Sequence, residues 1–326
     1  MPIRAIVAAA AALAIAAGHP AAGEVVLPSG SKAKVPVSRI DEVVVYHKQW
    51  EELVVRAVLA DPEGASCVER LALIIPVPVD PDLVELEDPA VFTDVKAFDL
   101  RRPDGYPPLS EIPGDYDLSP IKREPGKPIF ETLNAWLQLN GLNTVTDGSL
   151  DYYERNDWSF VVLRVSRCSH RSAGMLKPVR ICFEGQAISF PLKHVREGRP
   201  ITASVFLITK NSVDISPLED FGFTLGSGGD VPNRVKIKRL PHSVESMIRK
   251  FGNHRSVFRE LTRGRIYFYS AKADFGAGDA DAPAWKTDVE LPEPRMSPYG
   301  IAQNVLAVSA AVLMVVLLSR PRRKSG

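Results

Sequence analysis

The sequence has few cysteines and lacks the catalytic signatures that spacing alone can reveal. Its three cysteines, Cys67, Cys168 and Cys182, are too few for a disulfide scaffold and odd in number. It contains no P-loop, no G-x-G-x-x-G after a predicted strand, no G-x-S-x-G elbow and no H-E-x-x-H. The pattern therefore gives no indication of a nucleotide-binding protein, an elbow-type hydrolase or a zinc protease, and it predicts no cofactor.

The body of the chain also lacks an excess of positive charge. Of the 40 Lys and Arg residues, five lie at the two extreme ends, so the other 35 are outnumbered by the 39 Asp and Glu residues. A nucleic-acid binder carries a basic face. The charge balance therefore predicts no nucleic-acid partner.

Long apolar runs occur only at the two ends, and the first has the features of a signal peptide. Arg4 precedes an apolar stretch from Ala5 to Ala17, and small residues follow before Glu24. We predict that residues 1–23 are a signal peptide recognised by the export machinery and removed by signal peptidase. The alternatives are an uncleaved anchor or a buried Ala-rich helix.

The second apolar run indicates a single transmembrane helix over residues 299–319. The strict run from Val305 to Leu318 is about 21 Å long as a helix, and the extended one about 31 Å, close to the bilayer core. A basic tail, residues 320–326, follows, and the positive-inside rule places it in the cytoplasm with the body outside. A buried core helix is the alternative. The anchor residues are Val305, Leu306, Leu313, Leu317, Leu318, Arg320, Arg322, Arg323 and Lys324.

A Pro-Glu-Pro motif, Pro292-Glu293-Pro294, precedes this helix. The motif, the apolar helix and the basic end together resemble the C-terminal sorting tails of some bacterial surface proteins. In those tails a membrane enzyme cuts at the motif and releases the body to the cell surface. The motif lies farther from the apolar run than in a compact tail. The alternative is an ordinary Pro-rich stalk over residues 274–298.

The sequence pattern of the body predicts strands interrupted by short helices. Three Val- and Ile-rich runs, Ile40–Tyr46, Leu53–Ala60 and Leu71–Val79, predict a three-strand meander. Further strands are predicted at 158–165, 179–183, 187–191, 201–208, 235–239 and 266–269, with a hairpin turn at Glu184-Gly185. Helices are predicted near 89–98, 130–140, 150–155 and 244–251.

This order of elements predicts an α+β fold with mainly antiparallel sheet, a few short helices and one C-terminal transmembrane helix. We expect the exported domain to cover residues 24–211. The Pro-rich segment 101–128 is predicted to be an irregular surface excursion, and residues 212–273 a C-terminal extension.

Four stretches in order resemble a family of uncharacterised exported bacterial proteins, a domain of unknown function. They are the strands that lead into Pro76-Val77-Pro78-Val79, the Trp136-to-Gly141 helix end, Tyr152-Tyr153-Glu154 before Trp158, and the Leu176–Leu192 block. The resemblance covers about residues 41–211. It implies a periplasmic or surface location with a signal peptide and a C-terminal anchor, and it implies no activity.

Cys168, His170, Cys182 and His194 form the one set with metal-binding chemistry, since sulfur and imidazole ligands suit zinc. Their spacing matches no known zinc motif. A disulfide between Cys168 and Cys182 is the preferred interpretation in an oxidising compartment, and free thiols are the other.

Two functions remain open from the sequence. The favoured one is a non-enzymatic, membrane-anchored module that binds a partner or ligand of the cell envelope. The other is a hydrolase-like extracytoplasmic enzyme with a site built from loops such as 101–128 and 219–230.

Overall fold

The computed structural model of the chain describes residues 25–64, 67–96, 109–145, 151–185, 187–190, 200–226, 240, 242–249, 260–261, 266–275 and 289–292. The predicted signal peptide, transmembrane helix and basic tail lie outside these residues, as do Glu293, Pro294 and His194. Within the described ranges, no helix is long and apolar enough to cross a membrane.

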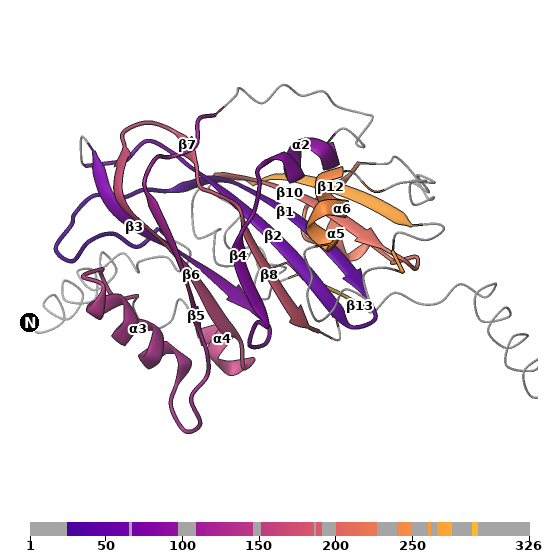
Figure 1. Cartoon of the computed structure of the whole chain (residues 1–326), viewed down its shortest axis with the longest axis horizontal. Coiled ribbons are helices and arrows are strands. Elements are labelled where there is room, and N and C mark those ends of the chain that lie inside the picture. The colour runs from indigo at the N-terminus through magenta and orange to yellow at the C-terminus, as the bar shows by residue number, and fades with distance from the viewer. Residues whose placement is uncertain are drawn as a thin grey trace, which may run out of the picture.

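The described residues are mostly sheet, with a few short helices (Figure 1). The large sheet has the strand order β11-β12-β10-β1-β2-β8-β4, with β7 paired to β2. Its strands are β1 Val37–His47, β2 Trp50–Leu59, β4 Leu83–Leu86, β7 Gly174–Met175, β8 Val179–Glu184, β10 Ile201–Thr209, β11 Thr224–Leu225 and β12 Tyr267–Phe275. Strands β1 and β10 run parallel, so the sheet is mixed, while the other pairs in it are antiparallel.

A second sheet of three antiparallel strands packs against the first. Its order is β3-β6-β5, formed by β3 Val68–Val77, β6 Ser159–His170 and β5 Asp115–Ile121. A two-stranded pair joins β9 Ala187–Phe190 to β13 Val289–Pro292. The coarse expectation of an α+β arrangement of sheet and short helices is confirmed.

The predicted three-strand meander is wrong, because the third strand leaves the first sheet. β1 and β2 do form a hairpin, but β3 pairs with β6. Leu73 of β3 faces the core between the sheets, whereas Ile74 faces the opposite side of its own sheet. Both faces of β3 are therefore buried, and its pairing with β6 places it inside the sandwich. The edge of β2 away from β1 is occupied by β8.

Three hydrophobic clusters hold the sheets and helices together as layers. The largest fills the space between the two sheets. A second lies under α2 Ala90–Lys96 and α6 His242–Arg249, which cover the outer face of the large sheet. A third lies under α3 Ile129–Leu139 and α4 Asp151–Arg155 on the outer face of the small sheet (Figure 1). The fold is therefore a helix–sheet–sheet–helix sandwich, with the short helix α5 Pro217–Asp220 beside β11.

The local helix signals are confirmed where the structure describes them. Asp88 Oδ1 accepts a hydrogen bond of 2.8 Å from the backbone N–H of Ala90, at the start of α2. Helix α3 buries Leu133 and Leu137, and Gly141 follows it with φ +67°, a conformation that favours glycine.

Three other predictions need correction. The segment 101–128 is not all irregular, since it contains β5. The segment 274–298 is not all stalk, because it contains the end of β12 and strand β13. Glu184-Gly185 does not close a hairpin: β8 pairs with β2 and β4, while β9 pairs with β13. In each case the local pattern indicated a turn or a loop, whereas the observed strand pairs with a strand that is distant in the sequence.

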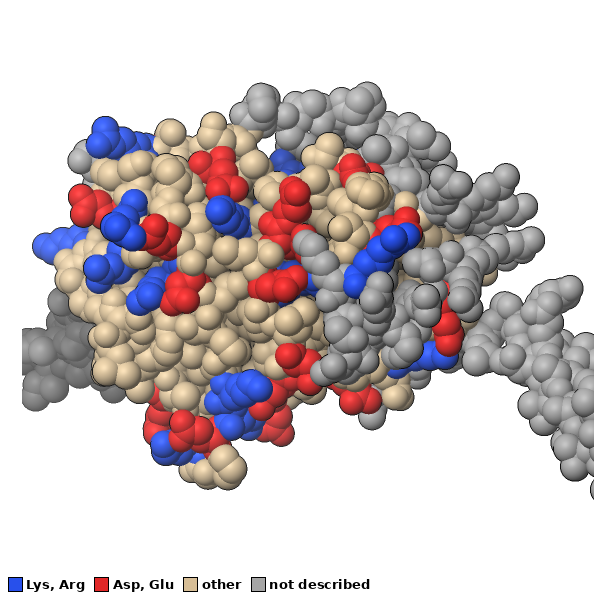
Figure 2. All heavy atoms as spheres, viewed as in Figure 1, with Lys and Arg blue, Asp and Glu red and all other residues tan. Residues whose placement is uncertain are grey.

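Charged side chains of both signs are interspersed on the face shown in Figure 2, without a patch of one sign among the residues coloured there.

Candidate ligand-binding cavity

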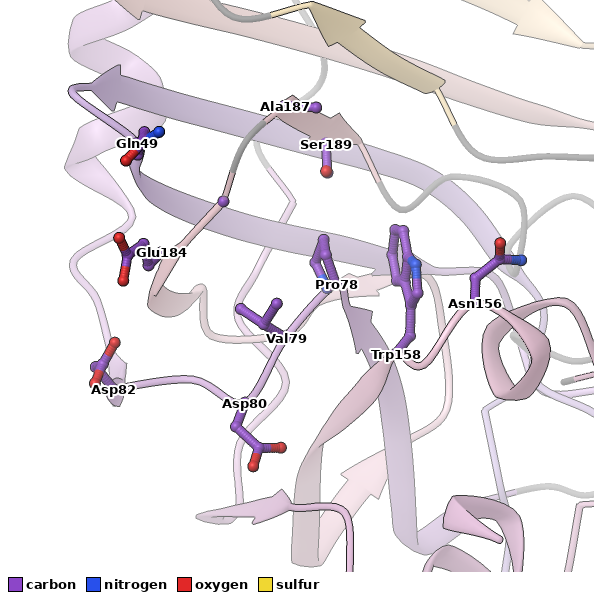
Figure 3. Close-up of a pocket in the computed structure, with 11 residues that line it drawn as sticks. Gln49, Pro78, Val79, Asp80, Asp82, Asn156, Trp158, Glu184, Ala187 and Ser189 are labelled. Atoms are coloured by element: carbon purple, nitrogen blue, oxygen red, sulfur yellow. The ribbon is translucent and has the colours of Figure 1, made fainter.

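A cavity of about 690 Å³ opens at one end of the sandwich (Figure 3). Five pieces of chain meet there: the turn between β1 and β2, the exit of β3, the start of β6, the end of β8, and β9. The cavity therefore lies where the chain passes between the two sheets.

One wall is made by Glu184, Gly185, Ala187 and Ser189, and the β1–β2 hairpin holds Gly185 in place. Lys48 and Gln49, the two turn residues, have φ of 52° and 66°, so the hairpin is tight. The carbonyl oxygen of Gln49 accepts a 2.7 Å hydrogen bond from the Gly185 N–H. The Tyr46 hydroxyl donates to the Gly185 carbonyl at 3.1 Å. The conformation of this wall is thus fixed from β1 and β2.

The opposite wall is the segment from Pro78 to Asp82, which carries the chain from β3 to β4. Ser159 Oγ donates a hydrogen bond to Asp80 Oδ1. The Asp82 N–H donates to the Cys182 carbonyl at 2.9 Å. Since β4 pairs antiparallel with β8, with Leu83 opposite Cys182, Asp82 and Glu184 lie near each other at the same end of β8.

The floor contains two buried polar side chains without a hydrogen-bond partner among the described residues. Trp158 is only 3% exposed, and its ring centroid lies 5.2 Å from that of Tyr153, yet no hydrogen bond engages its indole N–H. Ser189 is 2% exposed, and its hydroxyl points from β9 toward the space beside Pro78 and Trp158 (Figure 3). Because both residues line the cavity and neither polar group is fully enclosed, the two groups are available to a ligand.

The rim of the cavity is acidic. Three carboxylates line it, those of Asp80, Asp82 and Glu184, together with the amides of Gln49 and Asn156. Among the described lining residues, none is Lys, Arg or His. The cavity thus offers many hydrogen-bond acceptors and a negative field, with two donors at its floor.

The cysteine set singled out in the sequence does not assemble here. Cys67, Cys168 and Cys182 are all free thiols in the structure. Cys168 packs in the core between the sheets, whereas Cys182 lies in the cluster under α2 and α6. Burial raises the pKa of both of these thiols. The predicted Cys168–Cys182 disulfide is therefore absent.

The metal set is not assembled among the described residues either, where no three His, Cys, Asp or Glu side chains are grouped to hold an ion. His170 Nε2 instead contacts the Ala60 carbonyl oxygen at 2.8 Å. His194 lies outside the described residues.

Two buried ion networks lie on the helix-covered face of the large sheet, away from the cavity. In the first, Asp41 accepts hydrogen bonds from Arg39 at 3.0 Å and Arg56 at 3.1 Å, with Lys96 Nζ 3.7 Å away. Burial alone would raise the pKa of Asp41. The Arg39 hydrogen bond and the charges of Arg56 and Lys96 outweigh it, and the pKa is lowered. Arg56 also stacks 4.1 Å from the ring centroid of Phe92.

The second network surrounds Arg180, which is fully buried. It pairs with Glu52 and Glu85, lies 3.5 Å from Glu87, and donates a 3.1 Å hydrogen bond to the Met247 carbonyl of α6. Burial raises the pKa of Glu52 to about 8, although Arg180 opposes the shift. Both networks join α2 and α6 to the sheet, so we assign them to the architecture.

None of the residues that line the cavity is predicted as a site residue from the sequence. The loops at 101–128 and 219–230, which were candidates for an enzymatic site, contribute nothing to the described lining. Two acidic residues directly after the Pro76-Val77-Pro78 strand exit were the only available signal, because polar side chains at strand ends often face a crevice.

No family model matches the chain, and no curated protein matches it. Among solved structures, a mutated baculovirus P35 after caspase cleavage has a TM-score of 0.37 and 12% identity, over 79% of this chain and 100% of that one. P35 in complex with caspase-8 has a TM-score of 0.36 and 13% identity, over 78% of this chain and 96% of that one. Likenesses at this level carry no argument about function.

Proposed function

We propose that this chain is an exported, membrane-anchored binding module of the bacterial cell envelope, and that the cavity is its binding site. The ligand is a polar component of the envelope, held as a small molecule or as the end of a longer chain.

The observation that supports a binding role is the pair of polar groups at the cavity floor that have no protein partner among the described residues. Both residues are almost wholly buried, but the Trp158 N–H and the Ser189 hydroxyl are not fully enclosed, so water in the cavity can reach them. A ligand that accepts from the Trp158 N–H and pairs with the Ser189 hydroxyl takes the place of that water. The volume, about 690 Å³, falls within the range of about 300–1,000 Å³ that is typical of small-molecule sites.

The anchored location rests on the sequence. The apolar stretch 5–17 supports export, and the run 299–319 with the basic tail 320–326 supports a single span with the C-terminus inside. The acidic balance of the body supports a partner other than nucleic acid.

Co-sedimentation of the full chain, in a nonionic detergent, with purified cell-wall sacculi tests the binding role. We expect the protein to sediment with the polymer, and we expect Ser189→Leu, which fills the floor without changing charge, to stay in the supernatant. Glu69→Gln removes an exposed carboxylate at the far end of β3, and this control should sediment normally. Equal sedimentation of the Ser189 variant, or none by the wild type, would contradict the proposal.

A further inference from the structure

The chemistry of the cavity narrows the class of ligand, if the binding function proposed above holds. We infer that the cavity takes a hydroxylated amine, an amino sugar whose nitrogen is free and protonated. Its ammonium group lies among the rim carboxylates, and one of its oxygens lies against the floor.

The rim selects for positive charge. Asp82 and Glu184 come from neighbouring strands at one end of the large sheet, and Asp80 comes from the adjoining wall. Among the residues that the structure describes, neither Asp82 nor Glu184 has a cationic partner, and none of the described lining residues is Lys, Arg or His. A carboxylate or phosphate group held at this rim would be repelled, whereas an ammonium group is attracted and can donate three hydrogen bonds.

The floor selects for an oxygen acceptor. The Trp158 indole can only donate, and the Ser189 hydroxyl can donate or accept. Both side chains are at least nine-tenths buried and lack a partner among the described residues. A simple alkylamine would leave the indole N–H unpaired, so the buried end of the ligand must carry hydroxyl, ether or carbonyl oxygen.

The two requirements together describe an amino sugar. Its ring presents several hydroxyls for the Gln49 and Asn156 amides at the rim, and its amine supplies the charge. N-acetylation removes the positive charge of the amine but keeps the sugar ring. The site therefore discriminates between the free and the N-acetylated amino sugar.

Calorimetric titration of the full chain in detergent tests the inference with three trisaccharides of related shape: the glucosamine trimer, its N-acetylated form and the neutral glucose trimer. We expect the amine to bind at least about fivefold more tightly than the other two, from one or more charge-assisted contacts. We also expect its affinity to fall as salt rises from about 0.1 M to about 1 M, since the Debye length shrinks from about 10 Å to about 3 Å.

Variants separate charge from shape. Asp82→Asn and Glu184→Gln keep the side-chain volume and should each weaken binding of the amine about two- to fivefold, with no effect on the glucose trimer. Ser189→Ala should weaken binding of the amine about two- to tenfold through the lost hydrogen bond. Glu69→Gln is the matched control, and its affinity should equal that of the wild type. Unfolding midpoints of all variants identify any loss that comes from misfolding.

Several results would overturn the inference. Equal affinity for the acetylated or neutral trimer would reject the amine requirement, and loss of that binding in Ser189→Leu would leave the cavity as the binding site. Binding of Ca²⁺ alone, abolished by Asp82→Asn, would make the rim a metal site. Failure of all three trimers would reject the amino-sugar class, while sedimentation with sacculi would still decide the proposed function separately.

Discussion

The backbone N–H of Ser189 donates a hydrogen bond of 3.0 Å to Oε2 of Glu51, a fully buried carboxylate on β2. This bond joins the cavity wall in β9 to a strand 138 residues earlier in the chain. The Tyr46 hydroxyl also donates to the Gly185 carbonyl, and the Gly185 N–H donates to the Gln49 carbonyl, so the hairpin of β1 and β2 supports the site.

Replacement of Glu51 tests that support. Glu51→Ala leaves the Ser189 N–H unpaired in a buried position, and we expect it to lower the free energy of unfolding by about 1–3 kcal/mol. Glu51→Gln keeps an oxygen acceptor in a side chain of the same shape, so its free energy of unfolding should fall less than that of Glu51→Ala. Urea denaturation measures both. A Glu51→Ala protein as stable as the wild type would show that the bond contributes nothing.

The aromatic floor can be separated into packing and hydrogen bonding. Trp158→Ala should cost about 3–5 kcal/mol, because Trp158 is buried against Tyr152 and Tyr153. Trp158→Phe keeps an aromatic ring but removes the N–H, so it should retain most of the stability and lose ligand affinity. Thermal unfolding and ligand titration of the same samples make the comparison. Full affinity in Trp158→Phe would remove the indole from the site.

Asp41 should contribute to stability in a pH-dependent way. Its pKa is lowered from 3.8 in the folded state, so its contribution is present above 3.8 and is lost as the pH falls through the lower folded pKa. Asp41→Asn leaves Arg39 and Arg56 without their buried counter-charge and should cost about 3–5 kcal/mol at pH 7. The difference between variant and wild type should shrink in denaturation curves below pH 3.8. A constant difference at every pH would contradict this assignment.

The contribution of Glu52 to stability should depend on pH in the opposite direction to that of Asp41. Its folded pKa is about 8, above its ordinary 4.5, so its contribution is present below 4.5 and is lost as the pH rises through about 8. Glu52→Gln imitates the protonated side chain and should gain stability relative to the wild type between pH 5 and pH 9. Burial also lowers the pKa of Lys96 to about 8. Lys96 titrates in both proteins, so its contribution cancels in the difference between their free energies of unfolding. If the free energies of unfolding of the variant and the wild type differ by the same amount at pH 5 and at pH 9, Glu52 stays ionised.

The cysteines give a simple test of the redox state. The structure contains three free thiols, so the unreduced, denatured protein should bind three equivalents of a thiol reagent. In the folded protein we expect Cys67, which is partly exposed, to react first, because Cys168 and Cys182 are buried and their thiol pKa values are raised. One equivalent in the denatured protein would instead indicate that two of the three cysteines are joined in a disulfide.

Local sequence signals predicted the elements well. Helix α2 begins at Ala90, directly after Asp88 and Pro89, and α3 ends at Leu139, two residues before Gly141. Capping and periodicity are properties of a few neighbouring residues, so they can be read from the chain itself.

Pairing between strands could not be predicted in the same way. Val and Ile in β3 indicate a strand, but they do not show that its partner is β6, about 90 residues later. The cavity was missed for this reason. Asp82, Glu184 and Ser189 look like ordinary loop and strand residues until β4, β8 and β9 are placed, and the buried indole of Trp158 resembles any core aromatic.

Hydrogen–deuterium exchange of the full chain, with and without the glucosamine trimer, tests the central claim most directly. If the cavity is the binding site, the trimer should slow exchange in residues 78–82, 156–158 and 184–189, and leave α3 unchanged. Slower exchange confined to other surfaces, or no change at a saturating concentration of the trimer, would contradict the account.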